Sequence, residues 1–146
     1  MMKRVGVIGL GDMGSGLAKN LIKNGYETFG YDLLPERMKD LQEMGGKAAG
    51  DIADFAAKVD AMFIMVMNGN QVKSVLFGEN GLIKLMQPGS AVILTATIRP
   101  KEAYEIGVLM KMSGIHFIDT PVSGGYSGAQ QGTLTMMASA PADILD

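Results

Sequence analysis

Apolar residues follow two spacings along the chain, one typical of buried strands and one of amphipathic helices. The first run, Lys3–Ile8, is short, apolar and rich in β-branched residues, and it stops at Gly9. Such a run predicts a strand that is buried in a parallel sheet. Apolar residues then recur at helical spacing from Leu17 to Ile22, and Gly25 supplies the stop expected just past a helix end.

The same two patterns then repeat along the chain. Further strands are predicted at Glu27–Tyr31, Lys47–Ala49, Ala61–Met67, Ala91–Thr95 and Ile115–Asp119. Helices are predicted at Pro35–Met44, Ile52–Lys58, Gln71–Phe77 with an extension over Leu82–Met86, and Lys101–Met112. Strands that alternate with helical crossovers predict a doubly wound α/β domain, in which helices cover both faces of a mostly parallel sheet.

Length and composition narrow the class of protein. The 146 residues fit one domain, and the 47% hydrophobic content with a net charge of −2 argues against a disordered chain. Thirteen Lys and Arg residues against 15 Asp and Glu give no basic excess for nucleic acid, and no apolar run approaches the roughly 20 residues of a membrane span. Cysteine is absent, which excludes disulfides, thiolate metal sites and cysteine nucleophiles. We expect a cytoplasmic domain without a metal, a nucleic-acid partner or a membrane partner.

A glycine motif follows the first strand. The segment Gly9-Leu10-Gly11-Asp12-Met13-Gly14 has the spacing G-x-G-x-x-G, and it lies between a predicted strand and a predicted helix. Gly9 would allow the tight turn, Gly11 would let a pyrophosphate approach the backbone, and Gly14 would let the helix pack on the strand. The free N–H groups of the helix start would then face the anion. An ordinary glycine-rich turn is the alternative.

Asp32 is the second candidate binding residue. It ends the second predicted strand, 18 residues after Gly14, where a carboxylate would accept hydrogen bonds from the adenosine ribose. The same charge disfavours a 2′-phosphate, because two like charges about 4 Å apart at a dielectric of about 20 repel by about 4 kcal/mol. Arg37 could compensate in part, but we interpret it as a surface charge of the next helix. The sequence therefore predicts NAD in preference to NADP; a solvated aspartate at a helix start is the alternative.

A second glycine-rich segment follows the last strand and runs from Asp119 to Leu134. Pro121 would end the strand, Ser123 would cap a new helix, and Gly124 and Gly125 would place bare N–H groups at its start. The carboxyl ends of parallel strands share one edge, so this second anion site would lie on the same edge as the first. A small carboxylate would suit it.

This segment, together with Gly9–Gly14 and Thr97-Ile98-Arg99-Pro100, resembles the β-hydroxyacid dehydrogenases. That family includes 3-hydroxyisobutyrate dehydrogenase, tartronate semialdehyde reductase and 6-phosphogluconate dehydrogenase. The resemblance extends from about Val5 to the end of the chain. Gln71–Gly81 and Met136–Ser139 are most similar to the L-threonate dehydrogenase branch.

The resemblance implies roles for individual residues. The residues around the pyrophosphate would be Gly9, Gly11, Asp12, Met13 and Gly14, and those at the adenosine would be Asp32, Leu33 and Leu34. Val66, Met67 and Gln71 would line the path of the cofactor, and Thr97 would approach the nicotinamide. The substrate carboxylate would be held by Ser123, Gly124 and Gly125.

The resemblance also implies a catalytic group that this sequence lacks. In the family, a lysine of an all-helical second domain takes the hydroxyl proton. No lysine here matches that motif, and we interpret His116, the one histidine, as an incidental strand residue. We therefore expect residues 1–146 to be the Rossmann-type NAD-binding domain of a dehydrogenase, truncated before its helical domain and inactive alone.

The complete enzyme would transfer a hydride between NAD and a small 3-hydroxy acid, of the L-threonate or 3-hydroxyisobutyrate type, and would be a homo-oligomer. A non-catalytic NAD-binding or scaffolding module is the first alternative. An imine reductase or a phosphorylated-sugar-acid reductase on the same scaffold is the second.

Overall fold

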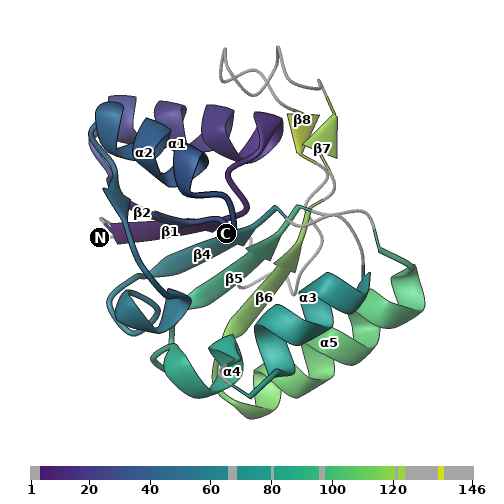
Figure 1. Ribbon diagram of the computed structural model, residues 1–146. Coiled ribbons are helices and arrows are strands. Elements are labelled where there is room, and N and C mark those ends of the chain that lie inside the picture. The colour runs from purple at the N-terminus through teal and green to yellow at the C-terminus, as the bar shows by residue number, and fades with distance from the viewer. Residues whose placement is uncertain are drawn as a thin grey trace.

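A six-stranded parallel sheet forms the centre of the computed structural model, which describes residues 4–65, 69–79, 81–95, 98–120, 122–123 and 135–136 (Figure 1). Its strands are β1 (Arg4–Ile8), β2 (Glu27–Tyr31), β3 (Lys47–Ala48), β4 (Ala61–Ile64), β5 (Ala91–Leu94) and β6 (His116–Asp119). The helices are α1 (Asp12–Lys23), α2 (Pro35–Glu43), α3 (Gly69–Phe77), α4 (Leu82–Leu85) and α5 (Pro100–Met112). None of these described helices is both long enough and apolar enough to cross a membrane.

The order of the strands is β3-β2-β1-β4-β5-β6. The chain therefore winds outward from β1 to β3, returns to the centre, and winds outward again on the other side from β4 to β6. Figure 1 shows α1 and α2 on one face of the sheet, and α3 and α5 on the other. The predicted doubly wound α/β fold is confirmed. In such a sheet the point where the winding reverses, here between β1 and β4, is the usual place for a ligand.

Five strands end at the same level. Ile8 pairs with Tyr31 on one side and with Ile64 on the other, and the register continues from Ile64 to Leu94 and from Leu94 to Asp119. We call the edge formed by these five residues the carboxyl edge. Every loop that leaves the carboxyl edge starts from a fixed point, so residues far apart in sequence are brought together there.

Each face of the sheet has its own apolar core. Beneath α1 and α2, Val7 and Leu41 are fully buried in the smaller cluster. Beneath α3 and α5, the larger cluster includes Ile64, Leu76 and Ile106, each at most 2% exposed. Successive residues of a strand point to opposite faces of the sheet, and here neighbouring residues such as Val7 and Ile8 are both apolar and buried. Both faces of the sheet are therefore apolar, as a parallel sheet between two helical layers requires.

The connection between β3 and β4 differs from the prediction. The helix expected over Ile52–Lys58 is a 3₁₀ turn over Ile52–Asp54. Asp51 accepts a hydrogen bond from the Ala53 N–H at 3.5 Å, and Asp54 accepts one from the Asp51 N–H at 3.2 Å. The turn stops at Phe55, whose φ of −131° is not helical. Phe55 is 1% exposed and stacks on Phe29 with ring centroids 5.7 Å apart.

Candidate dinucleotide-binding site

Gly9 makes the turn that leaves β1 at the carboxyl edge. Its φ of 93° lies in the left-handed region, which favours glycine. Its N–H donates to the Tyr31 carbonyl oxygen at 3.0 Å, and a Cβ on Gly9 would lie 2.9 Å from the Met65 carbonyl oxygen. The turn is thus held against the ends of both neighbouring strands, β2 and β4.

Gly14 lets α1 start directly on this turn. A Cβ added at Gly14 would meet the Gly9 carbonyl oxygen, well inside the 3.0 Å below which something must shift. The obstacle is backbone rather than a flexible side chain, so the helix itself would have to move. The third glycine of the motif is therefore required by the packing of the chain against itself, as predicted.

Gly11 is different, because nothing in the fold requires a glycine there. It caps α1 with φ −68° and ψ −162°, which any residue adopts. The atom nearest to an added Cβ would be Arg37 Nη1 at 3.6 Å, an ordinary van der Waals distance. Position 11 therefore has no side chain, although the structure has room for one there. The free space lies directly against the backbone at the start of α1.

The start of α1 is suited to an anion. The helix has 12 residues, begins at Asp12, and has no side-chain hydrogen bond at its N-cap. Main-chain N–H groups of the first turn, where Met13 also lies, carry the partial positive charge of the helix dipole. The turn, the bare Gly11 and these N–H groups together form a cradle that can accept a phosphate group.

Asp32 immediately follows β2 and lies beside this cradle. It is 8% exposed, and its Oδ2 accepts a hydrogen bond from the Leu10 N–H at 2.7 Å. Its Oδ1 accepts one from the Leu34 N–H at 2.9 Å. The carboxylate therefore joins the glycine turn to the loop after β2, and it is not a solvated aspartate. Arg37 Nη1 also donates to Oδ2, at 3.5 Å. A carboxylate offers about four acceptor positions, so about one remains for a hydroxyl group such as that of a ribose.

Arg37 is an exposed charge of the next helix, as interpreted from the sequence, but it also forms an ion pair with Asp32. Its Nη1 lies 3.5 Å from Asp32 Oδ2 and, as noted, beside Gly11, while the side chain stays 43% exposed. Sequence reasoning weighed only the five-residue separation. The structural cause is that α2 begins at Pro35, so position 37 lies in its first turn and faces back toward the end of β1. An arginine in the first turn of the helix after an acidic strand end was the available signal.

Two apolar side chains beside Asp32 are unusually exposed. Leu33 is 84% exposed and Leu34 is 42% exposed. Both belong to the loop between β2 and α2, next to the carboxylate that could hold a ribose. An apolar surface at this place suits the flat face of a nucleobase.

The structure describes only some of the other residues that were predicted for the site. Gln71 lies in the first turn of α3, which follows β4, and it is exposed. Ser123 lies in β7 (Val122–Ser123), where it pairs with Thr135 of β8 (Thr135–Met136). The helix that it was predicted to cap lies outside the described residues. The predicted residues that lie outside the described part of the chain are Val66, Met67, Thr97, Gly124 and Gly125.

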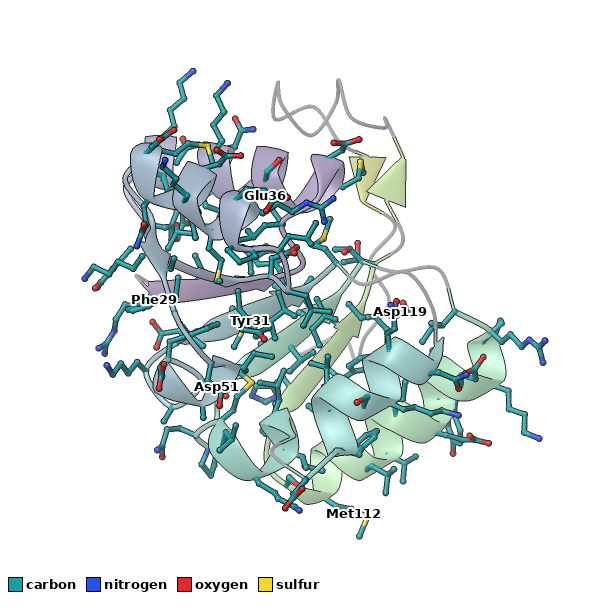
Figure 2. All side chains as sticks on the ribbon, in the orientation of Figure 1. Phe29, Tyr31, Glu36, Asp51, Met112 and Asp119 are labelled. Atoms are coloured by element: carbon teal, nitrogen blue, oxygen red, sulfur yellow. The ribbon has the colours of Figure 1, made fainter. Side chains whose placement is uncertain are left out.

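Asp119 and Thr120, at the end of β6, form a polar pair that sequence reasoning did not single out. Their Oδ1 and Oγ1 atoms are buried and have no hydrogen-bond partner in the structure as described. Burial raises the pKa of Asp119 above its ordinary value. Figure 2 shows Asp119 at the end of β6, on the carboxyl edge. His116 begins the same strand and therefore lies at its opposite end, away from the cradle.

A sequence profile described as the NAD binding domain of 6-phosphogluconate dehydrogenase matches residues 4–146. The chain belongs to this family. It is an NAD-binding domain with a Rossmann-like α/β fold, as the glycine motif and the resemblance to β-hydroxyacid dehydrogenases predicted.

Relatives with known names are similar over nearly the whole chain. L-threonate dehydrogenase of Cupriavidus necator is 39% identical over 143 residues, 98% of this chain and 48% of that protein. Mitochondrial 3-hydroxyisobutyrate dehydrogenase of Rattus norvegicus is 41% identical over 133 residues, 91% of this chain and 40% of that protein. The crystal structure of 3-hydroxyisobutyrate dehydrogenase from Salmonella typhimurium superposes with a TM-score of 0.89 at 42% identity, over 93% of this chain and 47% of that one. The chain spans about half the length of the relatives it matches.

Replacing Gly14 with alanine tests the packing of α1 on the glycine turn. The added methyl group would meet the Gly9 carbonyl oxygen, so Gly14→Ala is expected to lower the free energy of unfolding by about 1–3 kcal/mol or more. Gly107→Ala is the matched control, because Gly107 is also helical and its added Cβ would lie 3.6 Å from Phe117. That control should raise stability by up to about 1 kcal/mol through helix propensity. Urea unfolding measures both, and equal effects of the two substitutions would contradict the packing described.

Burial of Asp119 predicts a pH-dependent contribution to stability. Its folded pKa lies above the ordinary 3.8, so the folded state retains the proton to higher pH than the unfolded state. The contribution is complete below pH 3.8 and is lost as pH rises through the folded pKa. Asp119→Asn cannot titrate, so the stability of the wild type minus that of the variant should fall as pH rises from 3.8 toward about pH 7. Urea unfolding across this range tests it; a difference that rises with pH would contradict burial as the cause.

Proposed function

We propose that this domain holds NAD along the carboxyl edge, as the cofactor-binding half of an NAD-dependent β-hydroxyacid dehydrogenase. The observation that supports it most directly is Gly11. Its backbone conformation and its surroundings both accept a side chain, so the absence of one serves a group from outside the chain. A diphosphate that approaches the main chain at the start of α1 is such a group.

Each part of the cofactor then has a partner among the described residues. The diphosphate would lie against the backbone of Gly9–Gly14, and a ribose hydroxyl would donate to the free acceptor position of Asp32. The adenine would lie on the exposed apolar surface of Leu33 and Leu34. NAD itself supplies the hydride-accepting nicotinamide. The chain's own part is to hold and orient the cofactor along the edge toward β4, where the winding of the sheet reverses.

The proposed substrate is a small 3-hydroxy acid of the L-threonate or 3-hydroxyisobutyrate type. Two considerations support it. Relatives that match over more than 90% of the chain include proteins named for these substrates, and the segment after β6 leaves the same edge as the cradle. The segment Ser123–Gly125 would orient the carboxylate of the substrate. The nicotinamide would then meet the carbinol carbon in a fixed orientation rather than by free encounter.

The proton of the substrate hydroxyl needs a separate acceptor. We assign it to a lysine of the other half of a longer protein, because this chain spans about half of its relatives and no lysine in it matches the catalytic motif. The 146-residue chain would then bind NAD but not turn over. A non-catalytic NAD-binding module is the alternative. The coding sequence downstream of codon 146 separates the two, since an in-frame helical domain with a glycine-rich lysine motif belongs only to the dehydrogenase.

Gly11→Ala is the direct test of NAD binding at the cradle. The protein has room for the methyl group, so the free energy of unfolding should stay within about 0.5 kcal/mol of the wild type. The methyl group would occupy the space through which the diphosphate approaches the backbone, so the Kd for NAD should rise at least about tenfold. Isothermal titration calorimetry with NAD and urea unfolding measure the two effects.

Gly107→Ala adds the same methyl group to α5, on the other face of the sheet, and should leave the Kd for NAD unchanged. If Gly11→Ala binds NAD as tightly as the wild type, the cofactor does not lie against this backbone, and the proposal fails.

Asp32 and Arg37 together predict the choice between NAD and NADP. The wild type should prefer NAD, because the buried carboxylate of Asp32 repels a 2′-phosphate. Asp32→Asn should narrow this preference. Arg37→Ala should widen it, because the cation 3.5 Å from the carboxylate is then lost. We expect each change to be at least about tenfold in the ratio of the two Kd values. Equal or tighter binding of NADP by the wild type would refute the assignment.

A further inference from the structure

Arg37 places a basic side chain directly beside the bare backbone of Gly11. A Cβ added at Gly11 would lie 3.6 Å from Arg37 Nη1 and 3.9 Å from Arg37 Cζ. The guanidinium therefore borders the space that position 11 leaves empty. Arg37 reaches this space from the first turn of α2, and its side chain is 43% exposed. The cation is thus accessible to a group that enters the cradle from outside the chain.

The guanidinium has hydrogen-bond donors to spare. A guanidinium carries five N–H donors in a planar fork. Its contact with Asp32, from Nη1 to Oδ2, measures 3.5 Å, which is longer than the usual range of roughly 2.7–3.2 Å. Among the contacts of the described residues, this one engages a single nitrogen of the guanidinium, so other donors are left for a second anion. A phosphate group suits such a fork, because it can accept two parallel N–H···O bonds.

The charges around the cradle make a cation valuable at this place. Asp32 lies beside the cradle, and Asp12 is in the first turn of α1. A helix start carries only about half a positive charge. A diphosphate brings a negative charge on each phosphate, and the nearby carboxylates would repel it. The full positive charge of Arg37, which lies close to both Gly11 and Asp32, would offset that repulsion.

We propose that the Arg37 guanidinium binds the diphosphate of the dinucleotide at Gly11 and bridges it to the buried carboxylate of Asp32. This inference rests on the proposed binding of NAD, and it adds a charged side chain to the main-chain groups of the cradle. The diphosphate is common to NAD and NADP, so loss of Arg37 weakens the binding of both, in addition to changing their ratio. Arg37 thereby selects nucleoside diphosphates over nucleosides.

Arg37→Ala tests the assignment with three ligands, NAD, ADP and adenosine. NAD and ADP contain the diphosphate, so the Kd for each should rise at least about tenfold. Adenosine has the ribose that Asp32 would hold but no phosphate, so its Kd should stay within about twofold of the wild-type value. Titrations followed by amide chemical shifts measure all three affinities.

Two further variants are matched to Arg37→Ala. Lys39→Ala removes an exposed positive charge from the same helix, two residues on and about 200° around the helix axis, and should leave all three Kd values within about twofold. Arg37→Lys keeps the charge but loses the planar fork, so its Kd for NAD should lie between those of the wild type and Arg37→Ala. Urea unfolding should show that Arg37→Ala remains folded, because an ion pair with a half-exposed partner contributes little to stability.

The salt dependence of NAD binding separates direct contact from a purely structural role. Salt screens the attraction between an exposed guanidinium and a phosphate. From about 50 mM to about 0.5 M sodium chloride, the Kd for NAD should therefore rise more steeply for the wild type than for Arg37→Ala. If Arg37 only positioned Asp32, the two proteins would show the same salt dependence.

Three results would overturn the proposal: an affinity for NAD that Arg37→Ala leaves unchanged, adenosine binding that is weakened as much as NAD binding, or equal salt dependence of the two proteins. Failure of this inference is distinguishable from failure of the proposed function. If Gly11→Ala weakens NAD binding and Arg37→Ala does not, the cofactor lies at the cradle without Arg37. A wild type that does not bind NAD would overturn both.

Discussion

The buried carboxylate of Asp32 connects the parts from which the candidate site is built. One oxygen accepts the Leu10 N–H in the glycine turn, and the other accepts the Leu34 N–H in the loop after β2. Charge-assisted hydrogen bonds in a partly dehydrated position are strong enough to fix the relative position of two loops. With the in-register ends of β1 and β2 beneath them, these two loops present the cradle and the apolar surface of Leu33 and Leu34 together.

The three glycines of the motif show that one pattern can have several causes. Gly9 is required by a left-handed φ, and Gly14 is required because the helix packs directly on the turn. Only Gly11 is unexplained by the fold, which makes it the glycine most informative about a ligand. A motif match cannot separate these causes, whereas the free space around each glycine can.

The fold was largely predictable from sequence because both patterns that define it are local. Apolar runs and helical spacing gave the alternation of strands and helices, and parallel strands then placed Gly9 and Asp32 on one edge. What the sequence did not show depends on contacts between distant segments. Phe55 leaves the helical conformation and stacks on Phe29 where a longer helix was expected after Asp51, and the position of α2 brings Arg37 to Asp32.

An NMR titration with NAD tests the central claim most directly, because it locates binding at individual amides. If the cofactor lies along the carboxyl edge, the amide signals of Gly11–Gly14 and of Leu33 and Leu34 should shift most. The turns at Gly25, Gly89 and Gly114, which precede β2, β5 and β6 at the opposite ends of these strands, should stay unchanged. Saturable shifts centred on those three turns, with none at Gly11–Gly14, would contradict the account.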